Sequence, residues 1–345
     1  MKPLTVPMTT ALMAALFCAA SLVLPNVHAQ QGDAARWQFT EELKAKAEKG
    51  DPEAQSNLGA CYGHGAGVTK DYVEAVKWYR KAVEQNYAPA QNNLGSCYLK
   101  GNGVAKDVAE ALKLYRRAAE QHCAPAQANL AHCYDEGIGV TKDEWEAVTW
   151  LRKAAEGNYA ESQLCLGTSC HEGRGVAKDI AEALRWWRKA AEQNSAGAQC
   201  NLATCYYLGE GVAKDEVTAV EWWRKAAKQG FAEAQYNLGT AYHTGQGATN
   251  DFVEAVQWFL KAAEQDYAEA QNSLGACYAN GQGVAKDVVE AYAWFGLAAR
   301  TSGMALESQN RLVAKEMSPE QFLAGSRRTR ELRARIKAKI ENLGK

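Results

Sequence analysis

Residues 231–266 read FAEAQYNLGTAYHTGQGATNDFVEAVQWFLKAAEQD, and this pattern returns every 36 residues along most of the chain. Self-similarity at a fixed period of this length is the signature of stacked-repeat proteins. Seven copies fill residues 51–302 of the 345-residue chain without an insertion. One leucine in each copy marks the register: Leu58, Leu94, Leu130, Leu166, Leu202, Leu238 and Leu274.

Each copy carries the pattern of two helices joined by a short turn. The first helix reads A-Q-x-x-L-G-x-x-Y, as in residues 90–98, and its apolar residues share one helical face. A Gly-x-Gly follows, and glycine readily adopts the left-handed conformation that ends a helix. No predicted strand precedes this Gly-x-Gly and no third glycine completes it, so we interpret it as a helix end rather than a nucleotide-binding loop.

The second helix begins at an aspartate with an acidic residue three positions later, as in Asp107 and Glu110. This pair resembles a capping box, in which two side chains satisfy the free N–H groups at a helix start. Six copies have the glutamate, and the remaining copy has Thr218. Because the pair recurs once per copy, we interpret it as a cap and not as paired catalytic carboxylates. The fold predicted is all-α: an α-solenoid of seven 36-residue helix-turn-helix repeats with capping helices.

Composition supports a folded chain without a general attraction to nucleic acid. The sequence is 47% hydrophobic, contains ten tryptophans and has a formal net charge of −1. An apolar content this high argues against disorder, and a charge near zero gives no overall pull towards nucleic acid or an anionic membrane.

The two ends of the chain differ from the repeats. Residues 1–29 have one charge, an apolar run at 11–24 and a small-residue exit at 27–29, which predicts a secretory signal peptide cleaved after Ala29. The run is too short to span a bilayer, and no later segment is apolar enough. We expect an N-terminal cap helix within 30–50, the repeats at 51–302, and C-terminal capping helices with a basic tail at 303–345.

The basic tail has eight basic and two acidic residues between positions 327 and 345. A solvated cap helix explains this charge, and contact with an anionic surface, such as envelope lipid or an acidic protein, is the alternative. Nucleic acid is not expected as a partner, because no aromatic residue that could stack on bases is interleaved with the charges.

The whole pattern resembles the Sel-one-like repeat (SLR), a relative of the tetratricopeptide repeat. Residues 231–266 show it well, with Ala248 in place of the valine, while Cys170 replaces the tyrosine, Ala131 and Ala203 replace the glycine, and Leu114 replaces the tryptophan elsewhere. The resemblance implies a right-handed superhelix whose first helices line a concave surface. It also implies an adaptor or scaffold for protein complexes, and an exported bacterial member of Gram-negative type.

Nine cysteines remain beyond the expected signal peptide, and five of them share one register position: Cys61, Cys97, Cys133, Cys205 and Cys277. Equivalent positions on stacked helices lie too far apart for a disulfide, so we expect buried thiols. Some Sel-one-like proteins carry a disulfide in each repeat, but the second-helix partner position here is Ala-Ala in most copies. Cys165 with Cys200 is the one candidate bridge. The histidines are scattered and no C-x-x-C is present, so we expect no metal and no cofactor.

On each first helix, the positions two before, two after and five after the leucine are expected to face away from the core. Residues at these positions vary along the chain, and some are apolar or aromatic, as interface anchors are. Single exposed apolar residues are also ordinary on protein surfaces. The candidate partner-binding residues are Leu164, His171, Tyr207, Tyr236, His243, His132 and Asp135.

These features predict a non-enzymatic exported scaffold, periplasmic or secreted, that binds a protein or peptide in its concave groove. The alternatives are a hydrolase of the β-lactam type and a thiol- or metal-responsive envelope protein. Hydrolases of that type show S-x-x-K with S-D-N or K-T-G, and the sequence has none of these motifs. No catalytic residue is therefore assigned.

Overall fold

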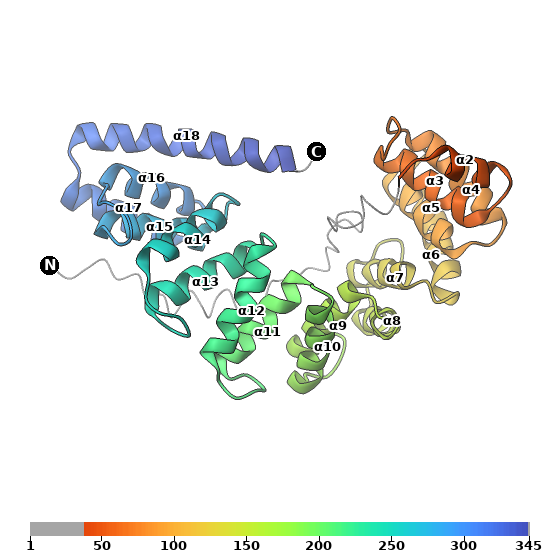
Figure 1. The fold of residues 1–345 in the computed structure, drawn as a ribbon, viewed down its shortest axis with the longest axis horizontal. Helices are drawn as coiled ribbons and strands as arrows, with labels where there is room; N and C mark the ends of the chain where they lie inside the picture. The colour runs from red at the N-terminus through yellow and green to blue at the C-terminus, as the bar shows by residue number, and fades with distance from the viewer. Residues whose placement is uncertain (1–37, 344–345) are drawn as a thin grey trace. The chain divides into compact units, whose positions relative to one another are not determined.

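Helices account for all the regular structure of the computed structural model, which describes residues 38–343. The predicted signal peptide at 1–29 and the first residues of the predicted cap, 30–37, lie outside the described residues. Figure 1 shows one short helix, then seven helical hairpins, then two closing helices. The prediction of an all-α solenoid of seven repeats is confirmed, while the handedness of its superhelix stays a prediction.

The helices follow the 36-residue register of the sequence. Helix α2 (Glu41–Glu48) precedes the repeats, and α17 (Gly303–Glu316) and α18 (Pro319–Leu343) follow them. The hairpins are α3 (Pro52–His64) with α4 (Tyr72–Glu84), α5 (Ala88–Lys100) with α6 (Val108–Glu120), α7 (Ala124–Glu136) with α8 (Glu144–Glu156), α9 (Ala160–Glu172) with α10 (Ile180–Glu192), α11 (Ala196–Leu208) with α12 (Glu216–Lys228), α13 (Ala232–Thr244) with α14 (Phe252–Ala263), and α15 (Ala268–Asn280) with α16 (Val288–Ala298).

The described residues form two compact units, here called the N-terminal unit (38–193) and the C-terminal unit (194–343). Within each unit, a second helix packs on the first helix of its own repeat and on the first helix of the next one. Helix α6 lies between α5 and α7 in this way, and α12 lies between α11 and α13. One hairpin therefore shares its apolar face with its neighbour, as stacking repeats require.

The aspartate caps are confirmed, but the reciprocal half of the capping box is wrong. The side chain of Asp143 accepts the N–H of Glu146 at 3.0 Å, as a cap does. The N–H of Asp143, however, donates to the carbonyl of Tyr134 on the first helix, 2.8 Å away. Because the Tyr134 carbonyl already accepts that N–H, the Glu146 side chain does not bind it. Glu146 instead accepts a hydrogen bond from the indole of Trp150 at 2.9 Å.

The second glycine of each Gly-x-Gly does more than end a helix. Gly281 and Gly283 both have a positive φ, of 70° and 72°. A Cβ on Gly283 would lie 2.1 Å from the carbonyl oxygen of Phe252, the first residue of the preceding second helix. A Cβ on Gly281 would meet its nearest neighbour, Lys286, at 3.4 Å. The second glycine thus lets one repeat's turn press against the helix start of the repeat before it.

The invariant glutamine of the first helices is buried and joins consecutive repeats. Gln127 is 3% exposed, and its amide donates to the carbonyl of Ala119 near the end of the preceding second helix. A second glutamine, Gln121, directly follows that second helix and donates to Gln91 on the first helix of its own repeat at 2.8 Å. The bond from Gln127 gives the Ala119 carbonyl, near the helix end, a second donor beside the N–H of His122. The same long-range pairing recurs as Gln85 with Gln55, Gln193 with Gln163, Gln229 with Gln199, and Gln265 with Gln235.

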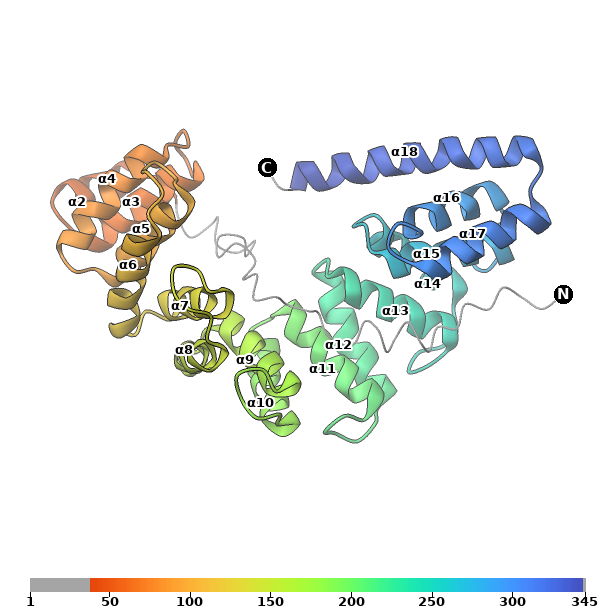
Figure 2. The same cartoon turned by 180° about the vertical axis from the view of Figure 1, so that it is seen from behind.

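Helix α18 closes the C-terminal unit by lying along α16 and continuing past it, as Figure 2 shows. It starts with a complete capping box, in which Ser318 and Gln321 each accept the other's backbone N–H. Leu332, Ile336 and Ile340 form an apolar stripe along α18 at a spacing of four residues; the first two are buried, but Ile340 is 43% exposed. Part of the basic charge faces the chain itself, because Arg335 and Lys339 both bind Glu264.

Candidate functional site

Three of the seven candidate residues do not reach the surface, so the prediction that all of them face solvent is wrong. Tyr236 is 1% exposed, and His171 and Asp135 are each 3% exposed. The ring of Tyr236 packs against Tyr267, at the start of the next first helix, with centroids 5.5 Å apart. At Tyr236 the position two before the leucine therefore faces the neighbouring first helix and belongs to the contact between repeats, whereas Leu164, at the same position of its own repeat, is only half-buried.

The position five after the leucine contacts the turn of the following repeat. Tyr207 donates a hydrogen bond to the side chain of Gln246 at 2.8 Å, and Gln246 is the middle residue of a Gly-x-Gly. His243 meets Gln282 at 3.4 Å in the same register. In the N-terminal unit, Asp135 meets Arg174 at 3.8 Å. In these three copies the residue at this position therefore contacts the middle residue of the next Gly-x-Gly.

What remains of the candidate face is a narrow row of half-buried side chains in each unit, which we call the N-terminal strip and the C-terminal strip. Four of the seven candidates lie in these strips, two in each unit. The N-terminal strip consists of Ser96, Leu99, His132 and Leu164, and the C-terminal strip consists of Thr204, Tyr207 and His243.

A half-buried acid in the C-terminal unit had no signal in the sequence. Burial, reinforced by the nearby carboxylate of Glu269, raises the pKa of Glu233 on α13 to about 7. Tyr236 and Tyr267 pack in the same neighbourhood, and burial raises the pKa of both phenols. Glutamate at this position looks like an ordinary first-turn acid in sequence, and its burial follows from the neighbouring repeats.

This shift predicts that stability falls as the pH rises through 7. The folded state holds the Glu233 proton more tightly than the unfolded chain, so the stabilisation is complete below pH 4.5 and lost through about pH 7. Between pH 5 and pH 8, the free energy of unfolding should fall by about 2 kcal/mol more in the wild type than in Glu233→Gln. Urea unfolding at both pH values measures this. The control Glu221→Gln, exposed on α12, should keep the wild-type pH dependence, and the same dependence in Glu233→Gln would contradict the assignment.

The cysteines of the described chain are thiols, and no disulfide joins any two of them. The five at the shared register position are buried, as predicted, and burial raises the pKa of Cys97 to about 11 and that of Cys205 to about 12. The candidate bridge between Cys165 and Cys200 is not formed. The two cysteines occupy different register positions. Cys200 packs in the contact between α11 and α13, where the side-chain amide of Asn237 donates to its sulfur.

The tryptophans of the second helices are held by a repeated three-residue arrangement. The indoles of Trp150, Trp186 and Trp258 donate to a glutamate one turn earlier. A lysine one turn later covers the ring, as Lys261 covers Trp258 at 3.8 Å. The row of glutamates therefore anchors tryptophans on the second helices.

Between positions 38 and 343, no three histidine, cysteine or acidic side chains gather closely enough to hold a metal ion. None of the helices in that range combines the length and apolar content needed to cross a membrane.

A sequence model of the Sel1 repeat matches the chain in seven consecutive stretches, 52–87, 88–123, 124–159, 160–195, 196–231, 232–267 and 268–300. The chain belongs to the Sel1 repeat family. Sel1 repeats are a tetratricopeptide-like scaffold fold that typically mediates protein–protein interaction and is generally non-catalytic. The comparisons do not support the alternative of a hydrolase or a thiol- or metal-responsive protein.

Several solved structures match this chain. A Sel1 repeat protein from Oxalobacter formigenes is 34% identical, with 78% of each chain covered and a TM-score of 0.63. The protective antigen c5321 of uropathogenic Escherichia coli, which has an SLR fold, is 31% identical over 87% of this chain and 81% of its own, with a TM-score of 0.39. Cysteine rich protein B of Helicobacter pylori is 26% identical over 37% of this chain and 92% of its own, with a TM-score of 0.32. No curated protein matches the chain.

Proposed function

We propose that this chain is a non-enzymatic, exported scaffold that binds a protein or peptide partner along its first-helix strips. The observation that carries the proposal is that the core positions and the strip positions of the first helices differ in how much their residues vary. Their core positions repeat nearly the same residues from copy to copy, whereas the half-buried strip positions combine apolar, aromatic and imidazole side chains. Such a mixture suits a partner that needs both apolar contact and hydrogen bonds.

In the N-terminal strip, we expect Leu164 and His132 to contact the partner. They come from consecutive first helices, α9 and α7, and both are half-buried. A partner segment that crosses the two helices would cover an aliphatic group and an imidazole together. In the C-terminal unit, Tyr207 and His243 are already partly used by the turns they contact, so a partner would add to those contacts.

Export is the second part of the proposal. It rests on the charge, apolar run and small-residue exit of residues 1–29. A scaffold processed in this way would meet its partner in the periplasm or outside the cell, and the concave groove expected for the family would be the docking surface.

Affinity capture with matched variants tests the binding proposal. The purified protein is immobilised and exposed to envelope and culture-medium extracts of its source cells, and retained proteins are identified by mass spectrometry. One dominant protein should be retained by the wild type and lost about tenfold with Leu164→Ser combined with His132→Ser. The control is Val217→Ser, which removes an apolar side chain that is 60% exposed on a second helix. Equal retention by all three proteins would contradict the proposal, provided that circular dichroism shows them equally helical.

A further inference from the structure

A hollow of about 440 Å³ lies in the C-terminal unit, beside the second half of α18. It is enclosed by the second half of α18, the last turn of α16 and the turn that precedes α15. Its floor is aliphatic, formed by Leu297, Ile336 and Ile340. Ile340 is 43% exposed at its mouth, which is unusual for a side chain in the apolar stripe of a cap helix.

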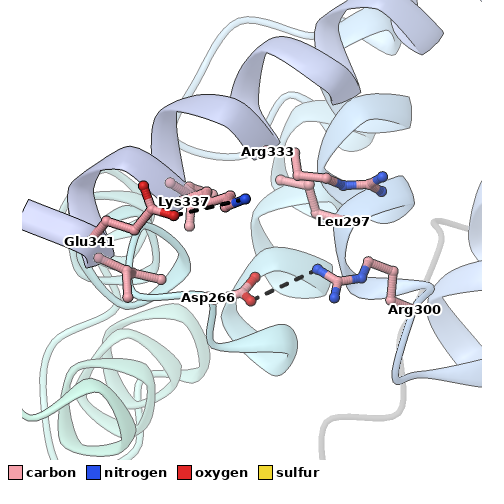
Figure 3. A pocket seen from close by; sticks show the side chains of 8 residues that line it. Asp266, Leu297, Arg300, Arg333, Lys337 and Glu341 are labelled. Carbon is pink, nitrogen blue, oxygen red and sulfur yellow. Dashed lines mark ion pairs between the residues drawn. The ribbon is translucent and has the colours of Figure 1, made fainter.

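Three cationic side chains, Arg300, Arg333 and Lys337, line the hollow around its aliphatic residues. Figure 3 shows Arg300, Arg333 and Lys337 about the hollow, with the Asp266–Arg300 and Lys337–Glu341 ion pairs dashed. These two pairs are long, at 4.0 and 3.8 Å, and their side chains are largely exposed, so each contributes little energy. Arg333 is exposed and takes part in no ion pair within residues 38–343. The cations are therefore available to an incoming anion.

We propose that this hollow binds the free carboxyl-terminal end of a peptide whose last residue is aliphatic. The aliphatic side chain would lie on the floor against Leu297 and Ile340. The terminal carboxylate would bind the guanidinium of Arg333, which can donate two hydrogen bonds to it, and Arg300 would lie close by. The last backbone N–H would donate to the carboxylate of Glu341.

A peptide end and a fatty acid both have an aliphatic chain and a carboxylate. The two acidic residues at the edge of the hollow, Asp266 and Glu341, favour the peptide. Asp266 and Glu341 need hydrogen-bond donors when a ligand displaces the cations that face them. A peptide end supplies backbone N–H groups, whereas a fatty acid supplies none and would leave both carboxylates beside its chain. The rim therefore matches the mixed donor and acceptor pattern of a peptide end.

This pocket is distinct from the two strips, because none of its lining residues belongs to them. It also differs from a general attraction between the basic tail and an anionic surface. Failure of the pocket would thus leave the proposed scaffold function untouched, and failure of the strips would leave the pocket untouched.

Fluorescence anisotropy on the full chain tests the pocket. The probe is a fluorescein-labelled hexapeptide that ends in leucine with a free carboxylate, and its matched control is the same peptide with a carboxamide end. The free acid should bind at least about tenfold more tightly than the amide. Arg333→Gln and Ile340→Ser should each weaken binding about tenfold. Arg327→Gln removes an equally exposed arginine of α18 outside the hollow and should change the Kd less than about twofold.

Three outcomes would overturn the proposal. Equal affinity for the acid and the amide would show that the carboxylate is not recognised. Equal weakening by Arg327→Gln and Arg333→Gln would show attraction to the basic helix as a whole. Tighter binding of dodecanoate than of the peptide, measured by displacement of the probe, would identify a fatty-acid site instead.

Discussion

Replacement of Trp223 by alanine is expected to lower the free energy of unfolding by about 3–5 kcal/mol. Trp223 is 1% exposed and packs in the core that α11, α12 and α13 share. Its ring also lies 5.3 Å from that of Tyr207, so the substitution opens a cavity between two repeats and loosens the C-terminal strip. Urea unfolding followed by circular dichroism measures the loss.

The matched control is Trp145→Ala on α8. Trp145 is 67% exposed, so its removal should change the free energy of unfolding by less than about 0.5 kcal/mol. Comparable losses from the two substitutions would mean that the second-helix tryptophans do not divide between core and surface in the way described.

Gly283→Ala is expected to destabilise the protein by about 4 kcal/mol, because a backbone penalty and a steric clash act together. The residue has a φ of 72°, and its Cβ would lie 2.1 Å from the carbonyl oxygen of Phe252. That carbonyl belongs to a helix start and cannot move without disturbing the preceding repeat. The expected result is a large drop in the urea midpoint.

Gly281→Ala separates the two contributions. Its φ is 70°, but the added Cβ would meet nothing closer than 3.4 Å, so only the backbone penalty of about 1–2 kcal/mol applies. If the two alanines cost the same, the second glycine is merely a helix end and the close contact between repeats is not important for stability.

The fold could be predicted from the sequence because its decisive signals are local and repeated seven times. The leucine register, the Gly-x-Gly and the aspartate caps each specify where a helix starts or ends. The second half of the capping box could not be predicted, because the N–H of Asp143 is satisfied by Tyr134, a partner whose proximity depends on how tightly the turn closes. The role of Gln127 was missed for a similar reason, since its acceptor lies at the end of the preceding repeat.

The candidate site was harder to predict because exposure depends on neighbours outside a single helix. Helical periodicity placed the leucine of each first helix in the core, and all seven leucines are buried. It could not show that the next first helix covers Tyr236, or that the next turn supplies Arg174 to Asp135. Periodicity describes one helix, whereas burial in a stacked array is set by the two repeats on either side.

The central claim is that a partner docks on the first-helix strips, and site-specific photo-crosslinking tests it most directly. A photo-crosslinking amino acid is placed at His132 or Thr204, in the strips, and at Val73 or Val217, which are exposed on second helices. We predict that the same partner protein is crosslinked from both strip positions and from neither second-helix position. Adducts that form equally from second-helix positions, or from those positions alone, would contradict the claim.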